Sequence, residues 1–279
     1  MEFLVIIVAL WLHHMLPDLG WIQQDGWYRK WIDYIKGENR QLIRFFTMLA
    51  LPVVVLLLIL ATVDYFGNGL LKFAIELLGM LYVIGRGDLV SRFDKLEGDF
   101  ARNDFQAAYH DAEELHLNNR VTSAQTNAEF QRDLLETLSY RFFEHAFPVV
   151  FWFALLGLPG ALLYRLTQLY TETSGLEESQ LDRGERWLWL LEWLPARLLG
   201  LTFALVGNFA SCFQRWRECF FCGVRTTPNV LAHYVEGALT IDLQADVSSA
   251  GVTDLEMVKQ LFYRALTLWV CVIALLLVF

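Results

Sequence analysis

The chain has no excess of positive charge. Its 22 Lys and Arg residues stand against 31 Asp and Glu residues, which gives a formal net charge of −9. A protein that binds nucleic acid usually carries a basic patch, so we expect no nucleic-acid partner. Charge of either sign is scarce, because charged residues make up 19% of the chain. A typical soluble domain contains about 25% charged residues, so this deficit argues against the soluble class.

Cysteine and recognisable catalytic motifs are also scarce. The four cysteines are too few and too unevenly spaced for the disulfide framework of a small secreted protein. The glycine pairs Gly67-Asn68-Gly69 and Gly85-Arg86-Gly87 lack the Walker lysine and the Rossmann spacing. No nucleophile elbow, zincin pair or Ser/His/Asp set is recognisable. We therefore predict no cofactor and assign no catalytic residue.

Apolar residues, in contrast, make up 56% of the chain and gather in blocks. The clearest block, 45–63, has 19 uncharged residues, and as a helix it measures about 28 Å, close to the hydrocarbon thickness of a bilayer. The blocks predict an all-α, polytopic helical membrane protein that forms a single membrane domain over 1–279. The predicted spans are 3–16, 45–63, 70–85, 146–164, 195–214 and 265–279. The start Met1-Glu2 has no positive region, so we expect a retained first span and no signal peptide.

Two spans contain features that affect their path. In 146–164, the cluster Gly157-Leu158-Pro159-Gly160 is compatible with a kinked crossing helix or with a re-entrant hairpin, and the sequence leaves both open. Before 195–214, three tryptophans between 187 and 193 are typical of a membrane interface. We expect that segment to lie along the surface and a new helix to begin at Pro195.

The segment 86–141 is a polar, acidic, helical insertion with 11 acids and 7 bases. Gly98-Asp99 is interpreted as a turn between two of its helices. Four residues form an apolar stripe at helical spacing, namely Ala107, Ala108, Ala112 and Leu115. With both termini outside, the loops 17–44, 86–141 and 211–264 hold 5, 7 and 5 Lys or Arg residues, and the outer loop 165–186 holds 3. The positive-inside rule then predicts a cytoplasmic 86–141 in a bacterial inner membrane, with the lipid bilayer as partner.

Several polar groups invite a functional interpretation. Lys72 and Glu76 lie four residues apart within a span and can pair. Cys212, Cys219, Cys222 and His233 could supply zinc ligands, but the spacing from the first cysteine is not a standard one. His110, Glu113, Glu114 and His116 share one polar helix, where a solvated face is the more ordinary explanation. We expect no metal site in either group.

Two stretches carry a family resemblance. Residues 151–165 read Phe-Trp-Phe-Ala-Leu-Leu-Gly-Leu-Pro-Gly-Ala-Leu-Leu-Tyr-Arg, and residues 192–198 read Glu-Trp-Leu-Pro-Ala-Arg-Leu. Both resemble the membrane proteins of the CobD/CbiB family, and the order of segments is similar along most of the chain. The resemblance implies synthases that join an aminopropanol phosphate to cobyric acid during cobalamin assembly.

The chain departs from the synthases at their polar stretches. It has Tyr140-Arg141-Phe142-Phe143 where they carry a Glu-Asn pair followed by Asp, and Gln168-Leu169-Tyr170-Thr171 where they carry Asn-Thr-Leu-Asp. A remnant of their tail motif persists at 227–229 and 236–239. In these departures the chain is similar to family members associated with control of chromosomal β-lactamase. This resemblance predicts a non-catalytic regulatory or sensory protein, with a synthase or a small-molecule transporter as alternatives.

The polar positions that survive suggest a cavity for a small anionic ligand. We select seven candidate ligand-binding residues, which are Arg141, Glu144, Arg165, Glu192, Arg197, Asn229 and Glu236. The sequence does not identify protein partners.

Overall fold

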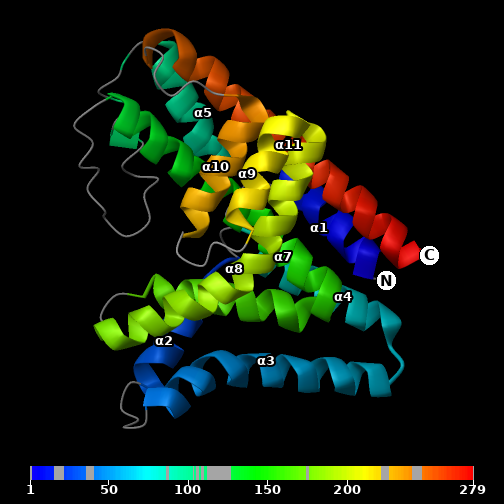
Figure 1. Ribbon diagram of the computed structural model, residues 1–279. Helices are drawn as coiled ribbons and strands as arrows, with labels where there is room; N and C mark the ends of the chain where they lie inside the picture. The colour runs from blue at the N-terminus through cyan, green and yellow to red at the C-terminus, as the bar shows by residue number, and fades with distance from the viewer. Residues whose placement is uncertain are drawn as a thin grey trace. The chain divides into compact units, whose positions relative to one another are not determined.

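The computed structural model describes the chain except at residues 1, 16–21, 36–40, 86–87, 103, 105–106, 108–109, 112–126, 174–175, 221–225, 241–246 and 279. The described part folds into ten helices without a strand, which confirms the predicted all-α class (Figure 1). The helices are α1 (Glu2–Met15), α2 (Gly26–Ile35), α3 (Gln41–Tyr65), α4 (Gly69–Val83), α5 (Asp88–Ala101), α7 (Asn127–Thr171), α8 (Glu178–Val206), α9 (Phe209–Cys219), α10 (Thr227–Leu239) and α11 (Val247–Val278).

Among the described residues, four helices are long and apolar enough to cross a membrane. They are Phe45–Tyr65 in α3, Gln131–Thr171 in α7, Glu178–Val206 in α8 and Leu255–Leu276 in α11. A helix suits this environment because it satisfies its own backbone hydrogen bonds where water is absent. The chain is therefore a multi-pass membrane protein. The count of six spans remains a prediction, since α1 and α4 have only 14 and 15 residues.

The predicted irregularity in the 146–164 span lies at Gly157. Its backbone leaves the helical region, with φ 69° and ψ −164°, in the middle of α7. A positive φ of this kind is readily adopted by glycine, which has no Cβ. Pro159 follows two residues later, inside the helix. The kink is thus confirmed, and the choice between a crossing helix and a hairpin remains open.

The expected helix start at Pro195 is wrong, because α8 continues from Glu178 through Pro195 to Val206. A proline inside a helix leaves the carbonyl four residues earlier without its usual donor. Here that carbonyl belongs to Leu191, and the Trp152 indole donates to it at 3.0 Å. Asn208 then caps α9 by accepting from the Ser211 amide. The predicted span 195–214 therefore includes the boundary between two helices.

The predicted turn at Gly98-Asp99 is also wrong, because both residues lie inside α5, which ends at Ala101. Asp99 is buried, and its carboxylate forms an ion pair with Arg102, which follows the helix end. Arg102 engages Asp99 Oδ1 from just beyond the helix end, so a partner for this buried charge is available without a turn at Gly98-Asp99. Three of the four residues of the predicted apolar stripe, Ala108, Ala112 and Leu115, lie outside the described residues.

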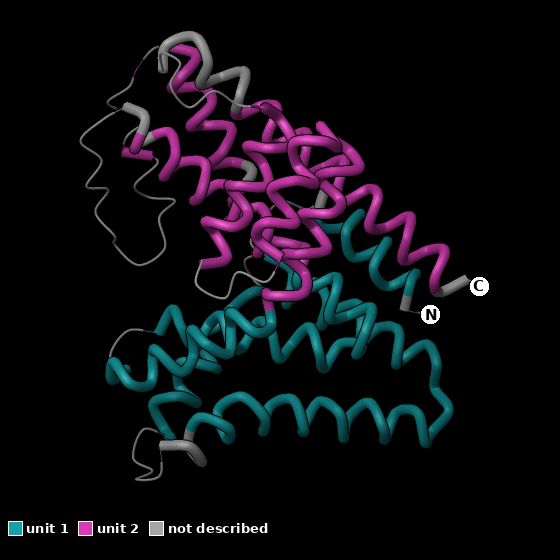
Figure 2. Tube along the Cα trace, in the orientation of Figure 1, with its two compact units in different colours: residues 1–87, 148–191 teal, residues 88–147, 192–279 magenta. Residues whose placement is uncertain are grey.

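The helices form two compact units (Figure 2). Unit 1 comprises Met1–Gly87 and Pro148–Leu191, and unit 2 comprises Asp88–Phe147 and Glu192–Phe279. In unit 1, the Phe45 ring contacts the Tyr170 ring at 5.3 Å between centroids. The core of unit 2 contains a phenylalanine cluster around Phe262, whose ring lies 5.0 Å from Phe203 and 5.3 Å from Phe142. Each unit is assembled from two separate chain segments.

Candidate functional site

A buried hydrogen bond joins α7 to α8 in unit 2. The Tyr140 hydroxyl donates to Glu192 Oε1 at 2.8 Å, and Glu192 is only 2% exposed. A buried carboxylate is costly unless hydrogen bonds compensate it. Tyr140 supplies one such bond to Glu192. Tyr140 is thus part of the polar contacts of unit 2, although it lies in a stretch where the chain differs from the synthases.

Arg197 lies five residues after Glu192 on α8 and is almost fully buried, at 1% exposure. Its guanidinium carbon is 5.2 Å from the centre of the Trp193 ring, and its Nε donates to the Phe220 carbonyl at 3.5 Å. The Arg197 carbonyl in turn accepts from the Trp216 indole at 2.8 Å. Both the charged end and the main chain of Arg197 are therefore held in place.

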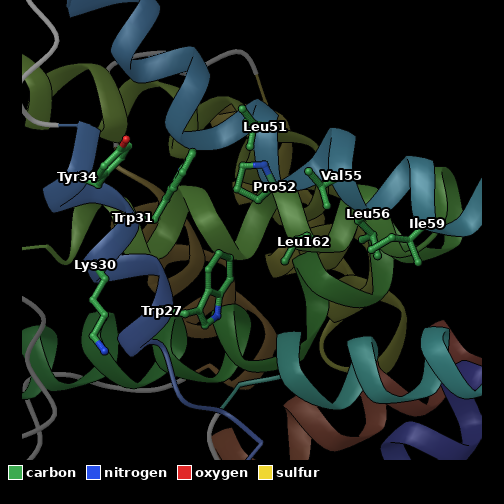
Figure 3. A pocket seen from close by; sticks show the side chains of 10 residues that line it. All are labelled: Trp27, Lys30, Trp31, Tyr34, Leu51, Pro52, Val55, Leu56, Ile59 and Leu162. Atoms are coloured by element: carbon green, nitrogen blue, oxygen red, sulfur yellow. The ribbon is translucent and has the colours of Figure 1, made fainter.

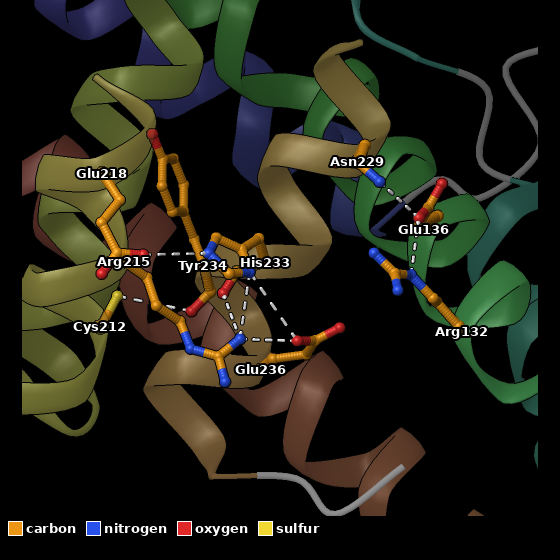
Figure 4. A network of polar contacts seen from close by, with 9 residues as sticks. All are labelled: Arg132, Glu136, Cys212, Arg215, Glu218, Asn229, His233, Tyr234 and Glu236. Atoms are coloured by element: carbon orange, nitrogen blue, oxygen red, sulfur yellow. Dashed lines mark hydrogen bonds and ion pairs between the residues drawn. The ribbon is translucent and has the colours of Figure 1, made fainter. Parts of the chain in front are cut away.

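A second polar group connects α9 to α10 (Figure 4). Arg215 Nη1 donates to Glu236 Oε2 at 2.6 Å and lies 3.2 Å from His233 Nδ1. A guanidinium has only donors, so Nδ1 accepts and the neutral imidazole carries its proton on Nε2. That nitrogen lies 4.0 Å from Glu218 Oε2. His233 therefore lies among a guanidinium and two carboxylates.

A third contact ties α10 back to α7. The Asn229 amide donates to Glu136 Oε1 at 2.9 Å, and Arg132 Nε lies 3.5 Å from the same oxygen (Figure 4). Asn229 belongs to the stretch that resembles the synthase tail motif. The polar groups of unit 2 thus connect α7, α8, α9 and α10.

Close helix packing supports these contacts. A Cβ added at Gly200 of α8 would lie 2.4 Å from the Tyr234 ring and 2.9 Å from the Trp216 ring. The missing side chain is what lets α8 approach α10 and α9 so closely. Cys212 of α9 is buried here, and its Sγ lies 3.5 Å from the Tyr234 carbonyl and 3.6 Å from that of Gly200. Cys212 therefore packs between α8 and α10.

Six of the seven predicted ligand-binding residues belong to unit 2. Arg141 pairs with Glu144 on α7 at 2.8 Å. The other four lie in the contacts above, namely Glu192, Arg197, Asn229 and Glu236. The sequence analysis did not select other residues of these contacts, among them Glu136, Tyr140 and Arg215, and it considered His233 only as a zinc ligand. Charge alone did not single out Arg215 or Glu136, because similar charges are common on solvated helices.

Arg165, the seventh candidate, lies in unit 1. It is buried, its Nη1 donates to Gln168 at 2.9 Å, and its Nη2 lies 3.6 Å from Asp25 Oδ2. The Tyr82 hydroxyl also donates to Asp25, at 3.3 Å. Asp25 directly precedes α2 and is 140 positions from Arg165 in the sequence. Spacing therefore could not reveal the pair.

The remaining sequence candidates are only partly described. Cys222, Glu113, Glu114 and His116 lie outside the described residues. Within the described ranges, no three His, Cys, Asp or Glu side chains gather in a way that could hold a metal ion. Lys72 Nζ lies 2.9 Å from Asp64 Oδ2, a partner that the sequence analysis did not consider, and Glu76 is buried on α4. The pairing of Lys72 with Glu76 remains a prediction.

Comparison with known proteins supports the family resemblance. The chain is similar to the cobalamin biosynthesis protein CobD of Chromobacterium violaceum, with 35% identity over 102 residues, 35% of this chain and 33% of that protein. It is also similar to the CobD protein of Stutzerimonas stutzeri, with 36% identity over 78 residues, 25% of each chain. The chain thus matches a third or less of the length of these relatives. No solved structure matches. The family model described as CobD/Cbib protein matches residues 6–260, and the chain therefore belongs to the CobD/CbiB family.

Proposed function

We propose that this chain takes part in cobalamin assembly as a membrane-bound synthase of the CobD/CbiB type. The two relatives are named cobalamin biosynthesis proteins, which favours this alternative over the regulatory role predicted from the sequence. The observation that carries the proposal is the packing of α8 against α9 and α10. Stretch 192–198 lies on α8, the remnant at 227–229 and 236–239 lies on α10, and contacts through α9 and Gly200 hold these helices together.

The chemistry of this site suits the substrates that the family resemblance implies. An aminopropanol phosphate and cobyric acid present phosphate, carboxylate and amine groups. Guanidinium groups bind phosphate and carboxylate well, because their planar set of donors matches two oxygens at once. We assign anion binding to Arg215 and Arg197, and acceptance of an amine N–H to Glu192. His233 adds an imidazole to the cluster, 3.2 Å from Arg215 Nη1 and 4.0 Å from Glu236 Oε2.

Complementation tests this proposal. The full chain is expressed in a strain that lacks its own synthase, and membranes are assayed for the amide product. We expect product formation, with a loss of about 100-fold or more for Arg215→Ala if this residue stabilises developing charge. Arg217→Ala is the matched control, since Arg217 lies on the same helix and is exposed. Absence of product, with the protein present at normal abundance in the membrane, would overturn the synthase.

A second candidate is a regulatory role like that of AmpE, the family member associated with β-lactamase control. A separate observation favours it. In the stretch 168–171, where the synthases carry Asn-Thr-Leu-Asp, the Thr171 hydroxyl donates to a main-chain carbonyl of its own helix, as does that of Thr167 just before it. Gln168 accepts from Arg165. These polar groups serve the fold of unit 1, which is the expected result if the synthase chemistry has been lost.

The two candidates predict different results in two strains, one deleted for this gene and one that lacks its own synthase and expresses this chain. A regulator in the bacterial inner membrane should change β-lactamase induction when its gene is deleted, and it should fail to restore the amide product. A synthase should give the opposite pattern. Unchanged induction after deletion would contradict the regulatory candidate.

A further inference from the structure

Unit 1 contains an apolar pocket of about 700 Å³ between α2 and α3 (Figure 3). We call it the α2–α3 pocket. The α2 side chains that line it include Trp27, Trp31 and Tyr34, and the α3 side chains include Pro52 and Val55. Its volume lies within the range of about 300–1,000 Å³ that is common for small-molecule sites. All the residues that line it belong to unit 1.

The walls of the pocket differ in chemistry. The α3 wall consists of aliphatic side chains and Pro52, whereas the α2 wall carries aromatic rings and one cation, Lys30. In Figure 3 the Lys30 side chain extends away from the α3 wall. Tryptophan and tyrosine are enriched where a membrane meets water, and lysine often places its ammonium at that level. The pocket is therefore apolar on one side and carries an anion-attracting group on the other.

An indole donor adds a second observation. Trp31 Nε1 is shielded from solvent and has no hydrogen-bond acceptor among the described residues. The Trp31 ring stacks on Tyr34, with centroids 6.3 Å apart, and this contact fixes the ring at the edge of the pocket. A shielded N–H without an acceptor costs free energy. A ligand that offers an ester or phosphate oxygen there would satisfy it.

The position of the pocket on α3 indicates that such a ligand enters from the bilayer. The α3 wall belongs to Phe45–Tyr65, the most apolar of the four candidate spans, and only 17% of its span is buried inside the protein. Val55 is 46% exposed and Trp27 is 45% exposed. Lipid chains therefore have direct access to the pocket from the bilayer.

We propose that the α2–α3 pocket binds one anionic phospholipid. An acyl chain lies along the apolar α3 wall. The phosphate lies within reach of Lys30, and an oxygen of the glycerol ester region accepts from Trp31 Nε1. This lipid fills the space between α2 and α3 and stabilises their packing.

The experiment uses the purified full-length protein in detergent. It is mixed with phosphatidylglycerol or with phosphatidylethanolamine of the same acyl chains, and retained lipid is counted by native mass spectrometry. We expect one retained phosphatidylglycerol, favoured about fivefold over phosphatidylethanolamine, since one lysine near an anionic head group contributes about that much. Equal retention of the two lipids would overturn the anionic preference.

Two matched pairs of variants locate the site. Val55→Trp fills the pocket and should abolish retention, whereas Val54→Trp adds the same ring at a neighbouring position, 50% exposed and outside the pocket, and should retain the lipid. Lys30→Gln should remove the preference for phosphatidylglycerol, and Arg29→Gln, exposed on the same helix, should keep it. If Val55→Trp does not fold, the comparison of Lys30→Gln with Arg29→Gln tests whether the lipid binds in this pocket.

Two results would overturn the proposal. One is lipid retention by a well-folded Val55→Trp variant equal to that of Val54→Trp. The other is displacement of the lipid by glycerol 3-phosphate, which has the head-group phosphate without acyl chains. That displacement would mean that the pocket binds a soluble phosphate compound.

Discussion

Units 1 and 2 each bury an arginine on a long apolar helix, but they hold it in different ways. In unit 1, Arg165 lies 3.6 Å from the buried carboxylate of Asp25, far away in the sequence. In unit 2, Arg197 is held by the Trp193 ring and by the Phe220 carbonyl, both within 23 positions. Burial alone therefore does not say what an arginine in a membrane protein does. The surrounding groups distinguish a structural ion pair from a group suited to bind an anion.

The comparison extends to the networks around the two arginines. In unit 1, the Arg165–Asp25 ion pair has two further partners. Tyr82 donates to Asp25, and Gln168 accepts from Arg165. The polar groups of unit 2 run across four helices and include His233, which lies among a guanidinium and two carboxylates. We expect changes in unit 1 to affect mainly stability, and changes in unit 2 to affect function as well.

The largest effect we predict is an all-or-none difference in sidedness between the predicted outer loop 165–186 and the predicted inner loops 86–141 and 211–264. Reporter fusions at Asn119 and Ser249, in unit 2, should report the cytoplasm, because the positively charged loops are predicted to lie there. A fusion at Ser179, in unit 1, should report the periplasm. If Ser179 and Asn119 report the same side, the segment 146–164 is re-entrant and the six-span topology is wrong.

Next in size is the loss of the ion pair in unit 1. Arg165→Ala should lower the free energy of unfolding by about 3–5 kcal/mol, because it leaves a buried carboxylate without its cation. Adding Asp25→Asn removes that charge and should recover part of the loss. Unfolding in mild detergent, followed by tryptophan fluorescence, measures both values. A double variant as unstable as the sum of the single variants would show that the two side chains do not interact.

A smaller loss is expected at Arg197, where the shape of the side chain matters as well as its charge. Arg197→Lys keeps the charge but loses the planar contact with the Trp193 ring, at a cost of about 2 kcal/mol for a desolvated cation–π pair. Arg197→Ala should cost more. The same unfolding assay ranks the two variants. If lysine restores full stability and activity, Arg197 acts only as a charge at the membrane boundary.

The Arg215–Glu236 contact should contribute less, because Arg215 is 31% exposed. A double-mutant cycle with Arg215→Ala and Glu236→Gln should give a coupling of about 0.5–1.5 kcal/mol, because partial exposure lets solvent screen the pair. Arg217→Ala, on the same helix, should leave the stability unchanged. A coupling near zero would show that the two side chains act independently and that other contacts hold α9 against α10.

Some features follow from the sequence and others depend on contacts between distant segments. The apolar block 45–63 predicts its helix, because length and hydropathy are local properties. The proline at 195 misleads, because the helix continues where Trp152, 39 positions away from Leu191, supplies a hydrogen bond. The partners of Glu192 and Asn229 were missed for the same reason. Tyr140 and Glu136 lie on another helix, and a single sequence does not show which helices meet.

The acidic segment of unit 2 also contains a contact that the sequence pattern does not show. Asp111 belongs to the predicted polar, acidic insertion, yet it is buried, at 7% exposure. Lys95 Nζ lies 2.7 Å from its Oδ1, and this hydrogen bond holds the pKa of Asp111 below its usual range. A carboxylate with a lowered pKa stabilises the folded state above the ordinary carboxyl pKa. That contribution disappears as the pH falls through the lowered pKa.

The smallest predicted effect therefore belongs to Lys95→Met, which removes the cation and keeps most of the chain length of the side chain. Lys95 is 62% exposed, so solvent screens the pair and the expected loss near neutral pH is about 0.2–1 kcal/mol. The difference between Lys95→Met and the unmodified protein should shrink as the pH falls below about 4, because Asp111 then becomes protonated. Thermal unfolding at a series of pH values measures it, with Lys259, which pairs with Asp94 at 2.6 Å, left intact in both proteins. A difference that stays constant down to low pH would assign the effect of Lys95 to the packing of its aliphatic chain, because an ion pair with Asp111 must titrate.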